Sequence, residues 1–183
     1  MTDFREFPKM ARLSREIIIT EKIDGTNASI YIGEDGEFLT GSRTRWITPS
    51  DDNFGFSRWA HEHKEELMQL GVGTHFGEWW GSKIQRGYGL TNGEKRFSLF
   101  NVSRWGDESD EVRPECCNAV PVLYRGPFET GSINAVLLML EECGSFAAPG
   151  FMKPEGIVVW HTAANIGFKR TLEKDEVPKS LVK

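Results

Sequence analysis

The sequence has few cysteines, no long apolar run and no excess of basic charge. Its three cysteines are too few and too unevenly placed for a disulfide framework, which favours a reduced, cytoplasmic setting. No stretch approaches the roughly 20 apolar residues of a membrane span. The mixed-charge start of the chain also lacks the apolar core of a signal peptide. We therefore expect no membrane association.

The charge balance restricts the partners that the protein can have. The 27 acidic and 22 basic residues give a net charge of -5, with a pI near 5.5. A small module that coats DNA or RNA through charge alone is usually basic, so the charge balance argues against this class, whereas it does not exclude an enzyme with a local basic face. At 183 residues the chain is long enough to bury a core. We expect residues 1–183 to form one domain and the protein to be a monomer.

Hydrophobic patterning predicts an α+β domain in which short, mostly antiparallel strands are interrupted by two helices. The β-branched run at 17–20 predicts a buried strand, and an Asp-Gly turn at 35–36 predicts a hairpin. Residues 106–118 are charged and predict a solvated loop. The other expected strands are 28–32, 38–40, 74–80, 97–102, 157–161 and 166–169, and the expected helices are 56–70, closed by Gly71, and 133–143.

The segment Glu21-Lys22-Ile23-Asp24-Gly25-Thr26-Asn27 follows the first of these strands. A lysine beside apolar walls loses its proton more easily and can act as a nucleophile. The glycine permits another group to approach the backbone closely. Because K-x-D-G is a weak pattern by itself, a solvated turn with an inert lysine stays open as the alternative.

Further short motifs follow in a fixed order. They are Gly41-Ser42-Arg43, Phe76-Gly77-Glu78, Phe97-Ser98-Leu99-Phe100, Pro154-Glu155-Gly156-Ile157-Val158 and Gly167-Phe168-Lys169. With the lysine motif, this series resembles the covalent nucleotidyltransferases, which comprise ATP-dependent ligases and mRNA capping enzymes. Glu-Lys-Ile-x-Gly-Thr-Asn is most similar to the RNA ligase branch that seals nicks in duplex RNA. The resemblance extends from about Glu21 to Lys169.

The resemblance implies a fold and a reaction. The fold would be an ATP-grasp-like nucleotidyltransferase domain, with antiparallel sheets on both sides of a nucleotide cleft. The reaction would be polynucleotide ligation, with RNA favoured over DNA as the substrate. Lys22 would attack the α-phosphate of ATP, in the presence of Mg²⁺ or Mn²⁺, to form lysyl-AMP. The AMP would then pass to the 5′-phosphate of one end, and the 3′-OH of another end would join to that phosphate.

The same resemblance implies roles for individual residues. Glu21, Ile23, Asp24 and Asn27 would line the nucleotide pocket, with Asp24 at a place where this branch often has histidine. Arg43 would lie near the ribose and phosphate, and Glu78 would bind the ribose hydroxyls. Phe100, or alternatively Phe97, would stack on adenine. Glu155 would bind the metal directly or through water, and Lys169 would contact the α-phosphate. A carboxylate suits that metal, since Mg²⁺ prefers oxygen ligands.

Two positions depart from the family pattern. Thr171 stands where relatives often carry a second lysine, and Trp160 stands where a lysine often ends the Glu-Gly-x-Val-x-Lys motif. Arg170 should face away from Thr171 if this segment is a strand. Only 14 residues follow Lys169, so we expect no C-terminal accessory or OB domain. A protein partner could supply it.

Basic and aromatic residues near the glycine-rich segment suggest contacts with nucleic acid. Lys83, Arg86, Lys95 and Arg96 form a local excess of positive charge, either a solvated loop or a set of phosphate contacts. Trp79 and Trp80 are neighbours in an expected strand, so one ring should be exposed and free to stack on a base.

Two other functions stay open at this point. One is a different covalent nucleotidyltransferase, of the capping type or with a small acceptor. The other is a catalytically weakened module that binds nucleotides or RNA ends, in which Trp160 and Thr171 mark the decay. The sequence does not separate RNA from DNA, or nicked from single-stranded substrates.

Overall fold

The computed structural model describes residues 3–176, which form two β-sheets with helices packed against them. The four-stranded sheet has the order β10 (Ile166–Thr171), β9 (Gly156–His161), β1 (Glu16–Lys22) and β8 (Val122–Pro127). The six-stranded sheet has the order β4 (Trp46–Ile47), β3 (Phe38–Gly41), β2 (Thr26–Ile32), β5 (Gly73–Gly81), β6 (Lys95–Leu99) and β7 (Cys117–Ala119). Neighbouring strands are antiparallel except β6 and β7, which are parallel. The α+β, mostly antiparallel class predicted from the sequence is confirmed.

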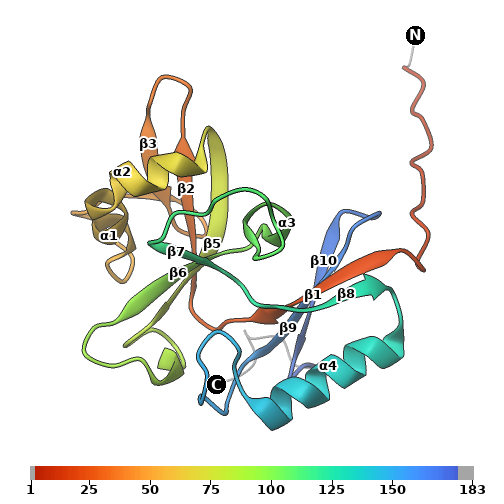
Figure 1. Ribbon diagram of the computed structural model, residues 1–183. Helices are drawn as coiled ribbons and strands as arrows, with labels where there is room; N and C mark the ends of the chain where they lie inside the picture. Colours follow the sequence, from red (N-terminus) through yellow and green to blue (C-terminus); the bar gives the residue numbers. More distant parts are fainter. Residues whose placement is uncertain (1–2, 177–183) are drawn as a thin grey trace.

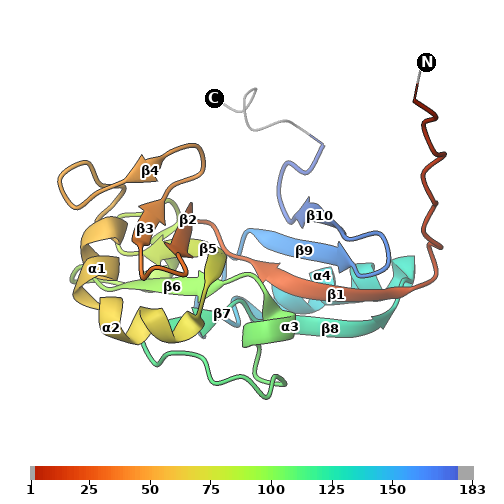
Figure 2. The same cartoon turned by 90° about the horizontal axis from the view of Figure 1, so that it is seen from above.

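The helices lie on the outer faces of the two sheets. Helices α1 (Phe56–Glu62) and α2 (Lys64–Leu67) pack on the six-stranded sheet, and α4 (Thr130–Cys143) packs on the four-stranded sheet (Figure 1). The sheets lie side by side, and the chain passes directly from β1 into β2 (Figure 2). The short α3 (Val102–Trp105) lies near the junction, where its Val102 joins a core shared by both sheets.

Strand β1 is buried on both faces, which explains its unbroken apolar run. Ile17 and Ile19 pack against α4 and β9, whereas Ile18 points the other way, into the core between the sheets. Because side chains alternate along a strand, Lys22 shares the face of Ile18. The strand therefore directs this lysine toward the junction of the two sheets.

Both predicted helices exist, with different bounds. The expected helix at 56–70 divides at His63 into α1 and α2 and ends in a 3₁₀ turn over Met68–Leu70. Helix α4 begins three residues earlier than predicted, at Thr130 rather than Ile133. Gly71 follows the 3₁₀ turn with a φ of 79°, a left-handed conformation that favours glycine.

Among the strands and α-helices of residues 3–176, four were not predicted, namely β4, β7, β8 and α3. Three of them have only two to four residues, too few to show a period of hydrophobicity. Strand β7 begins inside the segment expected to be a loop, and β6 ends at Leu99 rather than continuing to residue 102. Strand β8 is an edge strand with mainly exposed or half-buried residues, so it lacks the apolar run of β1.

The exposed tryptophan expected in β5 is absent, because both of its tryptophans are buried. Trp79 packs with Phe56 and Trp59 on the side of α1, and Trp80 points into the core between the sheets. Trp80 Nε1 donates a hydrogen bond of 2.9 Å to Ser98 Oγ. The prediction of an outward ring was wrong because both faces of this central strand are covered.

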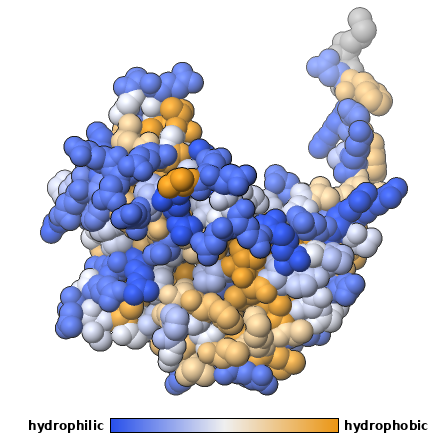
Figure 3. Space-filling view, viewed as in Figure 1, coloured by the Kyte–Doolittle hydropathy of each residue, from blue (hydrophilic) through white to orange (hydrophobic). Residues whose placement is uncertain are grey.

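The face seen in Figure 3 is largely hydrophilic, with apolar surface gathered over α4 and the segment that follows it. Exposed apolar residues of that region include Leu138, Phe146 and Met152. Within residues 3–176, no helix combines the length and the hydropathy that a membrane crossing requires.

Candidate active site

A cavity of about 980 Å³ lies where the two sheets meet, and most of the predicted site residues line it. Its walls come from β1, β5, β9, β10 and the segment around α3. The predicted residues in these walls are Glu21, Lys22, Ile23, Asn27, Glu78, Phe100 and Lys169. Glu155 contacts the lining residue Lys22, and Asp24 follows the lining residue Ile23 in the chain. Arg43, Lys83, Arg86 and Arg96 are not among the lining residues.

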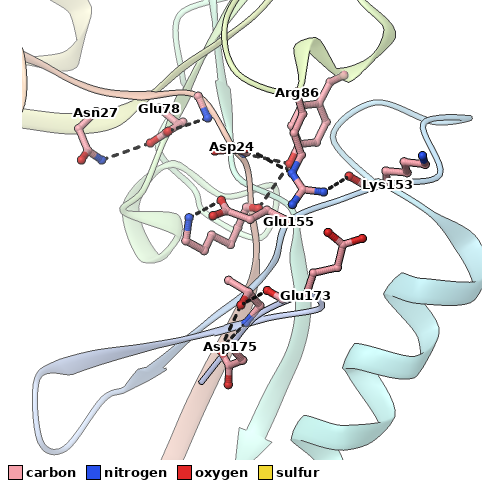
Figure 4. A network of polar contacts seen from close by, with 12 residues as sticks. Asp24, Asn27, Glu78, Arg86, Lys153, Glu155, Glu173 and Asp175 are labelled. Carbon is pink, nitrogen blue, oxygen red and sulfur yellow. Dashed lines mark hydrogen bonds and ion pairs between the residues drawn. The ribbon is translucent and has the colours of Figure 1, made fainter. Parts of the chain in front are cut away.

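Lys22 lies at the end of β1, opposite Gly156 of β9. Its Nζ donates a hydrogen bond to Glu155 Oε2, and the two side chains form an ion pair (Figure 4). The Glu155 side chain is only 3% exposed, so this carboxylate is held at the cavity wall with little access to water. Gly156 has a φ of +155°, and a Cβ there would lie 2.2 Å from the Arg170 carbonyl oxygen. Close packing of β10 therefore requires glycine beside Glu155.

Glu78 faces the cavity from β5 and accepts two hydrogen bonds (Figure 4). Its Oε1 accepts from the Gly25 amide at 3.0 Å and its Oε2 from Asn27 Nδ2 at 3.2 Å. Burial raises the pKa of Glu78 to about 7, against the lowering effect of the Gly25 hydrogen bond. A Cβ on Gly25 would lie 2.4 Å from the Trp79 carbonyl oxygen, so this close approach again requires glycine.

Asp24 and Arg86 form an ion pair beside the cavity. Arg86 Nε donates to Asp24 Oδ2 at 3.2 Å, and its second nitrogen donates to the Lys153 carbonyl oxygen at 3.0 Å (Figure 4). The Asp24 amide donates to the Tyr88 hydroxyl at 2.9 Å, and burial raises the pKa of that hydroxyl. Arg86 thus ties the lysine motif to the segment before Glu155. Its contact with nucleic acid stays a prediction.

Both carboxylate oxygens of Glu21 accept hydrogen bonds from the protein. Its carboxylate accepts hydrogen bonds from Ser145 Oγ at 2.6 Å, the Phe146 amide at 2.8 Å and the Ala147 amide at 2.9 Å. Burial raises the pKa of Glu21, and these three donors partly offset the effect. The geometry gives Glu21 a positioning role: it fixes the turn after α4 against β1. A direct contact with a nucleotide stays a prediction.

Lys169 extends over the cavity from β10, opposite Val158 of β9. Thr171 shares its face of the strand and hydrogen bonds to Asp175 Oδ1 and the Glu173 carbonyl oxygen. Arg170 points to the other face, as expected, where it donates a bond of 2.6 Å to Asn134 of α4. Arg170 therefore does not replace the cation that Thr171 lacks.

The structure separates the two phenylalanines proposed for the adenine. Phe97 is fully buried between Phe56 and Trp59, whereas Phe100 is 41% exposed and lines the cavity. The remaining basic candidates lie apart from the cavity. Arg43 is exposed in the turn between β3 and β4, Lys83 is exposed after β5, and Arg96 binds Glu94 and lies over the Trp80 ring.

Sequence reasoning missed further residues of the cavity wall, among them His75 and Arg104. His75 is buried on β5, where its Nε2 lies 2.8 Å from the Gly71 carbonyl oxygen and burial lowers its pKa. Arg104 of α3 lies over the Trp105 ring, 4.4 Å from its centroid. The signal for Arg104 was weak, because α3 is a single turn in a segment expected to be strand and loop.

Comparison with known proteins identifies the family. A family model described as RNA ligase matches residues 15–174. The chain belongs to the RNA ligase family. A search of curated proteins finds no match to this RNA ligase family member.

Solved structures similar to this family member include RNA ligase from Naegleria gruberi. A mutant with AMP and Mn aligns with a TM-score of 0.63 and 19% identity, covering 87% of this chain and 50% of that one. A mutant with ATP and Mn aligns with a TM-score of 0.64 and 19% identity, covering 88% of this chain and 51% of that one. The form with PPi aligns with a TM-score of 0.60 and 18% identity, covering 86% of this chain and 50% of that one. The nucleotidyltransferase fold predicted from the sequence is confirmed. The chain spans about half the length of these ligases.

The donor set of this RNA ligase family member fits a divalent cation. Glu155 supplies one buried carboxylate, and within residues 3–176 no group of three or more His, Cys, Asp or Glu side chains could hold a metal. Mg²⁺ is commonly bound by one or two carboxylates together with waters and substrate phosphates. A site with a single protein ligand is therefore consistent with an ion that arrives with a nucleotide.

Proposed function

We propose that this protein is an ATP-dependent RNA ligase that acts through AMP covalently bound to Lys22. One observation carries the proposal. Lys22, Glu78 and Lys169 come from three strands that are far apart in the sequence, and all three line one cavity in a chain of the RNA ligase family. A nucleophile, a ribose-binding acceptor and a cation are the groups that nucleotidyl transfer requires.

In the first step, Lys22 Nζ bonds to the α-phosphorus of ATP, the bond to the β-phosphate oxygen breaks and pyrophosphate leaves. The amine attacks as the neutral form, so Nζ releases one proton to solvent and leaves its contact with Glu155 as it turns to the phosphorus. Lys169, on the same face of the sheet, neutralises charge that builds on the phosphoryl oxygens. A divalent ion held by Glu155 would supply further neutralisation of that charge.

The opposite wall positions the nucleoside. Glu78 offers two carboxylate oxygens to the ribose hydroxyls, and the exposed face of Phe100 offers a stacking surface to adenine. These contacts fix the α-phosphate near Nζ, so the reaction gains from proximity.

The second and third steps use the activated AMP. An oxygen of an RNA 5′-phosphate attacks the AMP phosphorus, the bond to Lys22 Nζ breaks, and a 5′–5′ pyrophosphate linkage forms. The 3′-OH of a second end then attacks that 5′-phosphate, losing its proton, and AMP leaves. RNA is proposed as the substrate because of the family to which the chain belongs.

Incubation with ATP labelled at the α-phosphate tests the first step. Label should remain on the denatured protein in the presence of Mg²⁺ or Mn²⁺, and label at the γ-phosphate should not. Lys22→Ala should abolish the signal, whereas Lys9→Ala, at an exposed lysine outside the family match, should retain it.

The acceptor requires a second assay. Adding 5′-phosphorylated RNA should move the label from the protein to the RNA and then release it as AMP upon sealing. No label in the unmodified protein would contradict the proposal and favour a binding module. Labelling by GTP instead of ATP would indicate a capping-type enzyme.

A further inference from the structure

Trp160 lines the cavity, at a position where the family resemblance implies a lysine. It is 40% exposed, and it lines the wall formed by the four-stranded sheet. An indole cannot replace the charge of a lysine, but its flat face can stack on another ring. A large aromatic side chain that keeps this much exposure within a cavity is open to contact with a ligand.

Gly167 provides the space in which the ring lies. It is opposite Trp160 in the pairing of β9 with β10, and a Cβ there would lie only 3.2 Å from Trp160 Cε3. The ring therefore lies against the backbone of β10, where a larger residue would displace it. This packing fixes the indole while leaving part of it exposed to the cavity.

The register places Trp160 in line with the proposed catalytic lysines. Lys22 is opposite Gly156, Lys169 is opposite Val158, and Trp160 follows two residues later on the same face of β9. At about 3.3 Å per residue, the Trp160 position is roughly 7 Å from that of Lys169 along the sheet and roughly 13 Å from that of Lys22. A phosphate at Lys169 would thus have its nucleoside within reach of the indole.

The other wall already provides for the base of ATP. Glu78 and Phe100 belong to the six-stranded sheet and its continuation, whereas Trp160 belongs to the four-stranded sheet. The cavity volume of about 980 Å³ lies near the upper end of the range of about 300–1,000 Å³ for small-molecule sites, which leaves room beside one nucleotide. The cavity therefore offers separate aromatic faces for two bases.

We propose that Trp160 stacks on the terminal base of a 5′-phosphorylated RNA end whose phosphate is bound by Lys169. Single-stranded RNA ends are commonly recognised by stacking of splayed bases on aromatic side chains. The favoured substrate would be an end whose terminal base is free to leave its neighbours. This inference rests on the proposed function, because it assigns the second substrate to the same cavity.

Binding of a fluorescent, single-stranded RNA with a 5′-phosphate, measured by anisotropy, tests the inference without catalysis. Trp160→Ala should weaken binding about 5-fold to 150-fold, the range expected for one base stacked on an aromatic ring. Trp160→Phe should restore much of the affinity. Trp46→Ala is the matched control, since Trp46 is 54% exposed on β4, outside the cavity.

An RNA with an abasic 5′-terminal nucleotide identifies the contact. It should bind the unmodified protein as weakly as the normal RNA binds Trp160→Ala, and Trp160→Ala should cause no further loss with it. An equal loss with both RNAs would overturn the inference. So would unchanged binding of the normal RNA by Trp160→Ala.

The covalent assay separates the two proposals. If the unmodified protein takes no label from ATP, the ligase function fails, and the binding comparison still decides the role of Trp160. If the label forms, the rate of AMP transfer to RNA should fall in Trp160→Ala relative to the rate of label formation. A fall confined to label formation would place Trp160 on ATP and overturn the inference.

Discussion

Lys22 and Glu155 are 133 residues apart in the sequence, yet their side chains form an ion pair in the cavity. They meet because β1 and β9 are antiparallel neighbours, with Lys22 opposite Gly156. The nucleophile proposed for the reaction and the carboxylate proposed for the metal are thus joined by the pairing of two strands. Substitutions at this junction should therefore distinguish residues that affect the reaction rate from residues that affect the stability of the fold.

Glu155→Gln should slow formation of lysyl-AMP by about 100-fold, the typical effect of removing one charge-stabilising group. Glutamine keeps the shape of the side chain, but it loses the negative charge that holds Nζ and that would hold a divalent ion. The measurement is the rate of labelling by ATP labelled at the α-phosphate. Glu173→Gln, at an exposed carboxylate on the segment after β10, is the control and should retain the rate. Equal rates in Glu155→Gln and the unmodified protein would exclude this role.

Gly156→Ala should lower the free energy of unfolding by about 3 kcal/mol or more, because strain and overpacking add. The new Cβ would lie 2.2 Å from the Arg170 carbonyl oxygen, in a backbone with a φ of +155°. Gly150→Ala is the matched control, since Gly150 also has a positive φ but nothing within 4 Å. It should cost only the backbone strain of about 1–2 kcal/mol. Urea denaturation measures both, and equal losses would contradict the packing argument.

The sequence predicted the parts of the site that depend on strand order. Lys22, Glu78 and Lys169 each follow from a short motif on a strand, and pairing of those strands brings them together. Arg43 could not be placed in the same way, because it lies in an exposed turn whose direction no local pattern determines. Turn direction and side-chain reach depend on contacts that are not local.

Long-range contacts account for the other differences. The carboxylate of Glu21 binds the turn at Ser145–Ala147, which is more than 120 residues away in the sequence. No local pattern marks that partner, so the sequence predicted a role for Glu21 only through the family resemblance of its motif. Arg104 was missed for a different reason, since a four-residue helix is too short to show helical periodicity.

Glu78 should make the protein less stable as the pH rises from about 5 to 8. A glutamate carboxyl in an unfolded chain has an ordinary pKa of 4.5, whereas burial raises the pKa of Glu78 to about 7 in the folded protein. Between these values the unfolded chain binds fewer protons than the folded one, so the free energy of unfolding falls as pH increases. The contribution of Glu78 to the free energy of unfolding is fully present below pH 4.5 and is lost as the pH rises through 7. It amounts to about 3 kcal/mol at most.

Urea denaturation at several pH values, on the unmodified protein and on Glu78→Gln, measures this dependence. Glutamine retains an oxygen that can accept from the Gly25 amide, but it does not titrate. The variant should therefore show a flatter profile between pH 5 and 8. Parallel profiles for the two proteins would assign the pH dependence to other groups.

Thr171→Lys should increase the rate of lysyl-AMP formation at subsaturating ATP. Thr171 shares the cavity face of β10 with Lys169 and lies opposite Gly156, so a lysine there would bring a second cation toward the phosphates. One cation a few ångströms from a phosphate contributes about 1 kcal/mol in water, or roughly a fivefold gain. The gain should shrink as salt is added, because ions screen an exposed charge.

Two controls isolate the effect of the added charge. Ala163→Lys makes the same change in net charge at the exposed turn between β9 and β10, at the far end of the sheet from Lys22, and should leave the rate unchanged. Thr171→Ala removes the hydrogen bonds of the threonine hydroxyl to Asp175 and Glu173 without adding charge. If Thr171→Ala accelerates labelling as much as Thr171→Lys, release of the segment after β10 rather than the new cation is responsible. If neither variant changes the rate, the missing lysine does not limit adenylation in this protein.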